Sequence, residues 1–224
     1  LRVAWNRVHQ FTGEIPACRD IPVTRASHEG IVESIKAMEV KFRYKDGNSQ
    51  EYFEVGPINF EARKGEIIFI IGGNGSGKTT LAKLLTGLYE PDEGHLLIND
   101  KEVTGLQSGE YFSAIFSLAF LFEKLYNIDL TGRSEEVARY LKLLRLEEKV
   151  KITGGRYSTL ELSGGQRKRL ALLQCYLEDS PVYLFDEWAA DQDPDYRNFF
   201  YRTLLPEMKR QGKIIIAITH DDHY

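Results

Sequence analysis

Short apolar runs alternate along this chain with segments whose apolar residues recur at helical spacing. The runs cover residues 66–71, 182–185 and 213–219, and each is typical of a strand buried in a sheet. Leucines at positions i, i+3, i+4 and i+7 of a predicted helix follow the first run: Leu81, Leu84, Leu85 and Leu88. Another helix is predicted from Ser163 to residue 178. Strands that alternate with helices predict an α/β fold with a mainly parallel sheet.

A different pattern precedes the first buried run. Apolar residues alternate with polar ones, as in a half-buried strand, at Met38, Val40, Phe42 and Tyr44. Residues 45–48 form a turn signal, and residues 52–60 are predicted to return as a second strand that is interrupted at a Gly-Pro pair. Residues 95–99 predict a third strand. The domain is therefore expected to begin near residue 31 with an antiparallel β-subdomain.

The stretch from residue 109 to residue 160 changes character, because its apolar residues follow helical spacing. Ser134 is a predicted N-cap, with two glutamates in the first turn of the helix that follows. Residues 114–122 form the longest apolar run and are interpreted as a core segment. We therefore expect a helical subdomain, inserted at residues 109–168 and separate from the sheet.

Two prolines mark the last helical region. Asp193 and Pro194 are typical of an N-cap followed by proline at the first helical position. Pro206 is expected to kink or split this helix, because proline lacks the N–H that the helical ladder needs. Gly212 is expected to end it.

Composition and charge bear on the class of protein. The 224 residues suit one domain with a subdomain, and a hydrophobic content of 42% suffices for a sizeable core. The formal net charge of −4 argues against nucleic-acid binding. No apolar run approaches the roughly 20 residues of a membrane span, so the chain is expected to be soluble, whether alone or as part of a longer polypeptide. Cys18 and Cys175 lack metal-ligand spacing and suit reduced thiols, with Cys175 buried.

Residues 72–79 fit the pattern G-x-x-x-x-G-K-[ST], which forms a loop that cradles nucleotide phosphates. Glycines let successive N–H groups point at one anion, and the following helix directs its positive end to the same place. Lys78 is predicted to neutralise the β- and γ-phosphates, and Thr79 to bind Mg²⁺ through its hydroxyl. The predicted nucleotide-binding residues are Gly73, Asn74, Gly75, Ser76, Gly77, Lys78, Thr79 and Thr80.

Two adjacent carboxylates end the buried run at residues 182–185. Asp186 is expected at the carboxyl edge of the sheet, where nucleotide sites form, and is predicted to hold Mg²⁺. Glu187 is predicted to polarise the attacking water as a general base. Most such pairs merely end a strand in solvent, but downstream of a phosphate loop this pair becomes the expected metal site.

The string Leu-Ser-Gly-Gly-Gln begins the helix predicted at Ser163, and such a helix N-terminus is an anion site. It resembles the LSGGQ signature of ABC-type ATPases, and the resemblance covers residues 31–224. The implied fold is a P-loop NTPase core with a mainly parallel sheet, an antiparallel β-subdomain and a helical subdomain. The resemblance also implies a head-to-tail homodimer around two ATP molecules, in which each signature segment binds the ATP of the opposite subunit. This segment comprises Leu162, Ser163, Gly164, Gly165 and Gln166.

Three further positions resemble functional residues of that family, and a fourth departs from it. Tyr44 resembles an aromatic residue that stacks on adenine, although an aromatic residue in the core of a strand would look the same. His220 resembles the switch histidine that contacts the γ-phosphate and joins Lys78 and Glu187 as a catalytic candidate. Asp193 resembles the aspartate of the D-loop, which crosses the dimer interface. Ser117 stands where the family usually has a glutamine, and because its hydroxyl is shorter it would act through water; Gln107 is a less favoured candidate for that role.

Residues 186–194 and 219–224 resemble one exporter branch of the family, and the serine at position 117 does so as well. That branch carries its transmembrane domain on the same chain and exports cyclic peptides and peptide siderophores. The resemblance implies an ATPase domain at residues 31–224 on the cytoplasmic face of a membrane, the inner membrane in a bacterium. Residues 1–30 are interpreted as a connector from the transmembrane domain.

Three other interpretations stay open. A DNA-maintenance ATPase would share the dimer but carry a long coiled coil or a zinc module between the phosphate loop and the signature, and this chain has neither heptads nor cysteine pairs there. A stand-alone ATPase subunit, such as an importer component or a translation factor, lacks the exporter-like strings. A switch that binds nucleotide without hydrolysis would not need Lys78, Asp186, Glu187 and His220 together.

Overall fold

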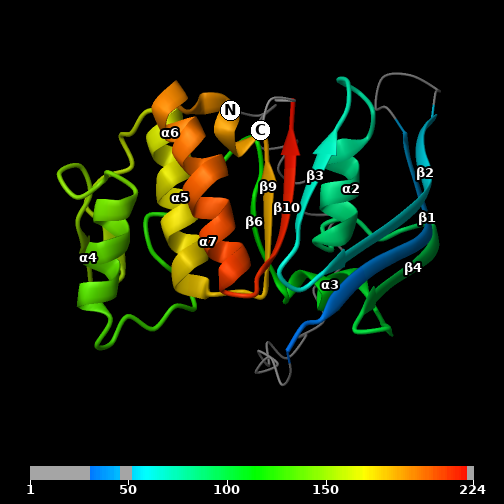
Figure 1. Ribbon diagram of the computed structural model, residues 1–224, viewed down its shortest axis with the longest axis horizontal. Helices are drawn as coiled ribbons and strands as arrows, with labels where there is room; N and C mark the ends of the chain where they lie inside the picture. Colours follow the sequence, from blue (N-terminus) through cyan, green and yellow to red (C-terminus); the bar gives the residue numbers. More distant parts are fainter. Residues whose placement is uncertain (1–30, 46–51, 221–224) are drawn as a thin grey trace, which may run out of the picture.

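A four-stranded parallel sheet forms the centre of the computed structural model, which describes residues 31–45 and 52–220 (Figure 1). Its strands, in spatial order, are β3 (Ile67–Ile71), β10 (Ile214–Thr219), β9 (Val182–Asp186) and β6 (Phe112–Ile115). Every residue of the two middle strands is buried. The predicted parallel sheet is confirmed, and its central strands are continuous hydrophobic runs because helices cover both faces.

Strand β3 differs from the prediction for residues 66–71. The run was expected to be buried, but Phe69 and Ile71 are exposed. Strand β3 has a partner, β10, on one side only and is an edge strand in the described part of the chain. An apolar run of five residues does not distinguish an edge strand from a central one, because neighbours in the sheet decide burial.

A second sheet is antiparallel and packs beside the first. Its order is β2 (Tyr52–Arg63), β1 (Ser34–Lys45), β4 (Glu93–Ile98) and β5 (Lys101–Val103). The predicted alternation breaks at Met38, which is exposed, because a bulge with Glu39 at φ 51° shifts the register of β1. The expected turn at residues 45–48 lies largely outside the described residues, as does the connector at residues 1–30.

Helices cover both faces of the parallel sheet (Figure 1). Helix α2 (Lys78–Leu85) lies between the two sheets, and α5 (Gly164–Glu178) packs on the opposite face. Helix α2 ends at Leu85, so Leu88, the last leucine of the predicted stripe, lies beyond the helix and is exposed. Helix α6 (Pro194–Phe199) continues through a π-helical turn, η2 (Phe200–Leu204), into α7 (Leu205–Arg210). The irregularity expected at Pro206 is therefore found just before it, in the π-helical turn η2.

The region from residue 109 to residue 168 is less helical than expected. It contains strand β6, which pairs with β9 in the central sheet, and helix α4 (Ser134–Leu143). A short hairpin, β7 (Ile152–Thr153) with β8 (Arg156–Tyr157), follows α4, and a small helix, α3 (Gly105–Gly109), precedes the region. Helix α4 starts at Ser134 with Arg133 at the N-cap position, so the predicted serine cap is wrong by one residue. The part that stands apart from the sheet begins after Ile115.

The apolar run at residues 114–122 does not form a core segment throughout. Ile115 and Leu121 are buried, but Leu118 is 91% exposed and Phe120 79% exposed. After β6 ends, the chain has no regular structure until α4, so alternate side chains point into solvent. Within the described residues, no helix combines the length and the apolar character needed to cross a membrane.

Candidate nucleotide-binding site

The loop between β3 and α2 has the backbone conformation that its glycines predict. Gly75 and Gly77 have φ of 77° and 87°, in the left-handed region that favours glycine. A Cβ at Gly77 would lie 3.0 Å from Cγ1 of Val55, so a side chain there would also crowd Val55. Gly77 is the N-cap of α2 and offers no side-chain oxygen, which leaves the first N–H groups of the helix directed toward the loop.

The ammonium of Lys78 folds back over this loop. Its Nζ donates hydrogen bonds to the carbonyl oxygens of Gly72 at 2.7 Å and Gly73 at 2.8 Å, and it lies 3.4 Å from Oγ of Ser76. The acceptors are all neutral, so no carboxylate cancels the positive charge, which can still attract an anion. An anion in the loop would meet this charge and the N–H groups of α2 together.

A cavity of about 300 Å³ opens over the loop. The described residues that line it are Phe53, Asn74, Gly75, Ser76, Gly77, Lys78, Thr79, Thr80 and Glu187. The structure therefore brings the predicted loop residues and Glu187 to one space. Only Gly73 of the predicted loop set is absent from this lining.

Phe53 is a residue of this cavity that the sequence analysis missed. It lies on β2, directly opposite Tyr44 on β1 in the hairpin register. The side chain of Tyr44 lies outside the described part of the structure, so its predicted stacking role stays a prediction. The hairpin pattern contained the signal for Phe53, because residues paired across two strands lie on the same face of the sheet.

Thr79 and Asp186 meet beneath the loop. The hydroxyl of Thr79 donates to Oδ2 of Asp186 at 3.1 Å and lies 3.4 Å from Oδ1. Asp186 is fully buried, and this burial raises the pKa of its carboxyl, partly opposed by the hydrogen bonds from Thr79 and from the backbone of Ser117. Mg²⁺ prefers oxygen ligands and is usually held by one or two carboxylates together with phosphates. This pair fits such an ion.

Ser117 reaches the site through its backbone. Its side chain is exposed, while its backbone hydrogen bond contributes to the environment of Asp186. Gln107, the alternative, is engaged elsewhere: its Oε1 accepts from the backbone N–H of Thr104 at 3.0 Å in the capping box of α3. The geometry therefore favours Ser117 over Gln107 at this position.

Glu187 is held in an unusual backbone conformation. Its φ is 52°, and its N–H donates to the carbonyl of Ile218 at 3.0 Å. Oε1 of its side chain lies 2.9 Å from Nε2 of His220. Both side chains are partly exposed, and Glu187 lines the cavity. The structure thus brings together the predicted general base and the predicted switch histidine, which are far apart in the sequence.

The signature segment starts helix α5. The hydroxyl of Ser163 accepts from the N–H of Gln166, and the Gln166 side chain accepts from the N–H of Ser163, which forms a capping box. None of the five signature residues belongs to the lining of the cavity over the loop of the same chain.

The segment predicted to be the D-loop packs against the helix that begins at the signature segment. Gln192 donates to the carbonyl of Gly165 at 3.1 Å and accepts from Arg169 at 2.9 Å. Asp193 is the N-cap of α6, as predicted, and accepts from Tyr196 N–H at 2.9 Å; this bond lowers the pKa of its carboxyl. Sequence reasoning missed Gln192 and Arg169, because contacts between a helix and a later loop leave no local pattern.

Comparisons with known proteins bear on the family and on the fold. The family model described as ABC transporter matches residues 55–190. The chain is 51% identical to the "ATP-binding protein SyrD" of Pseudomonas syringae pv. syringae over its whole length, and it spans 42% of that relative. The dimeric ATP-binding cassette MJ0796, solved with ADP and Pi, superposes with a TM-score of 0.70 at 24% identity, over 84% of this chain and 88% of that one. A bacterial Atm1-family ABC exporter with ATP bound superposes with a TM-score of 0.69 at 23% identity, over 98% of this chain and 40% of that one.

Proposed function

The chain belongs to the ABC transporter family, and from this premise we propose that it binds ATP and Mg²⁺ and hydrolyses ATP within a head-to-tail homodimer. The observation that carries the proposal is the position of Lys78, Thr79 and Glu187 on one cavity, with Asp186 hydrogen-bonded to Thr79 and His220 to Glu187. The loop N–H groups and Lys78 bind the phosphates. Mg²⁺, held by Thr79 and Asp186, would neutralise charge on the β- and γ-phosphate oxygens.

Glu187 acts as the general base in this proposal. Its carboxylate borders the cavity, and His220 lies within hydrogen-bond distance of it, so both can orient a water beside the γ-phosphate. A fixed orientation of that water supplies most of what phosphoryl transfer needs from a protein.

The second copy supplies the signature segment. The N-terminus of α5 lies outside the cavity lining of its own chain, and an anion there would share or replace its capping box, which supports a role toward ATP bound by the opposite subunit. ATP binding would close the two copies, and hydrolysis would reopen them, because the γ-phosphate contacts both.

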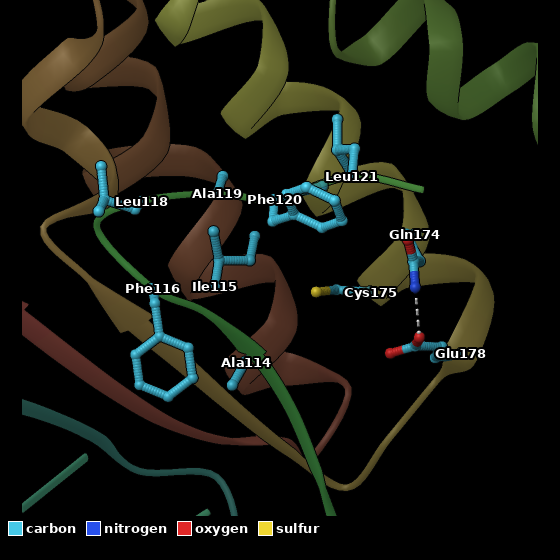
Figure 2. Close-up of a pocket in the computed structure, with 11 residues that line it drawn as sticks. Ala114, Ile115, Phe116, Leu118, Ala119, Phe120, Leu121, Gln174, Cys175 and Glu178 are labelled. Atoms are coloured by element: carbon cyan, nitrogen blue, oxygen red, sulfur yellow. Dashed lines mark hydrogen bonds between the residues drawn. The ribbon is translucent and has the colours of Figure 1, made fainter. Parts of the chain in front are cut away.

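The transmembrane partner is expected at an apolar surface, which we define as Leu118, Phe120, Phe122 and Tyr126. All four side chains are exposed, and the three aromatic rings form edge-to-face contacts at 5.2 and 5.7 Å. The surface adjoins a cavity of about 240 Å³ whose wall includes Leu121, Gln174 and Cys175 (Figure 2). Clustered exposed apolar residues mark protein interaction sites. Ser117, which also contacts Asp186, connects this surface to the nucleotide site.

The proposed assembly is an exporter of a peptide-like substrate, a cyclic peptide or a siderophore, with its transmembrane domain on the same full-length chain at the cytoplasmic face of the membrane. The relative SyrD is longer than this chain and nearly half of its residues differ in the matched region, so support for the cargo comes from the exporter-like strings at residues 186–194 and 219–224. Blotting of washed membranes from the native cells tests the fusion: a band well above 25.7 kDa is expected. A soluble band near this mass would instead favour the stand-alone ATPase subunit.

The variant Glu187→Gln tests the hydrolytic mechanism. It is isosteric and keeps hydrogen-bonding atoms, but its amide cannot accept a proton at neutral pH. We expect ATP hydrolysis to fall by about a hundredfold or more, while ATP affinity, measured by equilibrium binding, stays unchanged. Glu161→Gln, on the exposed surface, is the matched control and keeps normal activity. Hydrolysis at the wild-type rate in Glu187→Gln would refute the base assignment.

A further inference from the structure

Lys168 is a charged residue in the interior of the molecule. It lies on α5, and its side chain is 3% exposed, while the neighbouring buried positions of this helix hold leucines. An ammonium taken out of water is unfavourable unless other groups replace its hydration. A lysine at this position therefore needs hydrogen-bond acceptors or an opposite charge within the protein.

The partners all belong to the segment that carries Glu187. Nζ of Lys168 donates to the carbonyl oxygen of Glu187 at 2.7 Å and lies 2.7 Å from Oδ2 of Asp191. The backbone carbonyl of Lys168 accepts from Nε1 of Trp188 at 2.9 Å. Lys168 thus contacts the first and the last residue of a single short turn, η1 (Trp188–Asp191). It also contacts Glu187, the residue just before this turn.

The turn needs such support because Glu187 has the left-handed backbone conformation. A non-glycine residue keeps this conformation only where its surroundings determine it. Two contacts fix the peptide groups on either side: the N–H of Glu187 bonds to Ile218, and its carbonyl bonds to Lys168. If the second contact is lost, only the bond to Ile218 and the side-chain contact with His220 still hold Glu187, so the carboxylate is less firmly oriented toward the cavity.

The same helix begins at the signature segment. Lys168 follows Ser163 by five residues, more than one turn of the same helix, so continuous backbone hydrogen bonds connect the two positions. We infer that Lys168 is a positioning residue, which holds the Glu187 carboxylate in place and couples it to the signature segment of the same subunit. ATP held by the opposite subunit and bound at that signature would then bias the orientation of Glu187 toward its own ATP. This inference rests on the proposed function.

The variant Lys168→Met tests the inference in the chain used for the ATPase measurements. Methionine keeps an unbranched buried stem but has no donor, and Asp191 is exposed enough to be hydrated without its partner. We expect kcat to fall by about tenfold or more, with the KM for ATP changed less than about threefold and the Hill coefficient for ATP shifted toward 1. A purely structural role would lower the thermal midpoint and would leave the remaining folded protein with normal kcat and cooperativity.

Controls separate this inference from the proposed function. Lys142→Met removes an exposed lysine of α4 and keeps wild-type kinetics. In a Glu187→Gln background, Lys168→Met causes no additional loss, because it acts through Glu187. If Glu187→Gln is inactive while folded Lys168→Met has wild-type kcat and Hill coefficient, only the positioning role is refuted; if Glu187→Gln is active, the hydrolytic mechanism itself fails.

A second variant covers the case in which Lys168→Met does not fold. Lys168→Gln keeps a hydrogen-bond donor in the interior, but it is neutral and one bond shorter, so it cannot reach Glu187 and Asp191 together. The same loss of kcat is expected at unchanged KM. Wild-type kcat and cooperativity in folded Lys168→Gln would overturn the inference.

Discussion

The N-termini of α2 and α5 are both expected to bind phosphate, yet they are built in opposite ways. At α2, the N-cap is Gly77 in a left-handed conformation, and glycine has no side chain that could satisfy the helix. At α5, Ser163 and Gln166 satisfy each other's backbone N–H groups in a capping box. The first end is open to an anion and carries its own cation, Lys78, whereas the second is already satisfied. A phosphate at α5 must therefore share or replace the cap, which suits a contact that forms and breaks.

Helix α3 shows that the capping box alone does not indicate function. Thr104 and Gln107 form the same reciprocal pair of hydrogen bonds as Ser163 and Gln166. Helix α3 has five residues, and neither of the two capping boxes lines the cavity over the phosphate loop. What distinguishes α5 is its connection to Glu187 through Lys168 and to the D-loop through Gly165 and Arg169. The comparison separates helix stabilisation, which both caps provide, from phosphate binding.

The largest effect is expected at the open end. Lys78→Met removes the only side-chain cation among the described residues that line the cavity, and ATPase activity should fall by about 10²–10³-fold, as when a stabilising donor is removed from an active site. ATP affinity should fall as well, since the charge also contacts bound nucleotide. Lys83→Met, on the same helix but bonded to Tyr89, is the control and keeps nearly full activity. Equal losses in both variants would show that α2 is merely destabilised.

A smaller effect is expected at the capped end. Ser163→Ala and Thr104→Ala each remove one cap, and each should lower the free energy of unfolding by about 1 kcal/mol, which shifts the thermal midpoint by about 2–4 °C in a domain of this size. Only Ser163→Ala should also reduce ATPase activity, by about tenfold, the effect of one charge-assisted hydrogen bond. If both variants had the same activity, the signature serine would be a structural cap and nothing more.

Glycine substitutions test the difference between the N-termini of α2 and α5 by protein stability alone. Gly77→Ala introduces a Cβ at φ 87° and 3.0 Å from Val55, and should destabilise the protein by about 1 kcal/mol or more. At Gly164, the first residue of α5, a Cβ would have no atom within 4 Å and the φ is not left-handed, so Gly164→Ala should be neutral or slightly stabilising. Chemical denaturation of the two variants measures the difference. Similar losses would mean that the phosphate loop is not the strained end.

The smallest effect concerns the pH dependence of stability at the open end. Burial raises the pKa of Asp186, so the folded protein binds its proton more tightly than the unfolded chain does, and the carboxyl destabilises the folded state progressively as pH rises from about 3.9 through the raised pKa. Asp186→Asn removes this cost. Without nucleotide or Mg²⁺, its thermal midpoint should exceed that of the wild type at neutral pH by more than at pH 4. A difference in thermal midpoint that does not change with pH would contradict the raised pKa of Asp186.

The phosphate loop, the paired carboxylates and the signature could be placed from sequence because each is a local pattern with a local cause. Glycine spacing determines where the backbone can turn left-handed, and an apolar run that ends in Asp186 determines which strand end carries the metal ligand. The capping box of Ser163 was implicit in the same few residues. Errors arose where burial depends on remote neighbours: Phe69 and Ile71 lie on an edge strand, and Leu118 and Phe120 point into solvent.

The sequence by itself determined the chemistry available to this protein: a cation, a hydroxyl and two carboxylates at the ends of elements whose hydrophobic period identifies them. Only the tertiary structure decided which groups meet. Parallel strands bring their carboxyl ends to one edge, so Asp186 reaches Thr79 and Glu187 reaches His220. The packing of α5 against the segment after β9 places the buried Lys168 on the carbonyl of Glu187. Such contacts join residues distant in the chain, and their geometry depends on how layers pack, which no local period encodes.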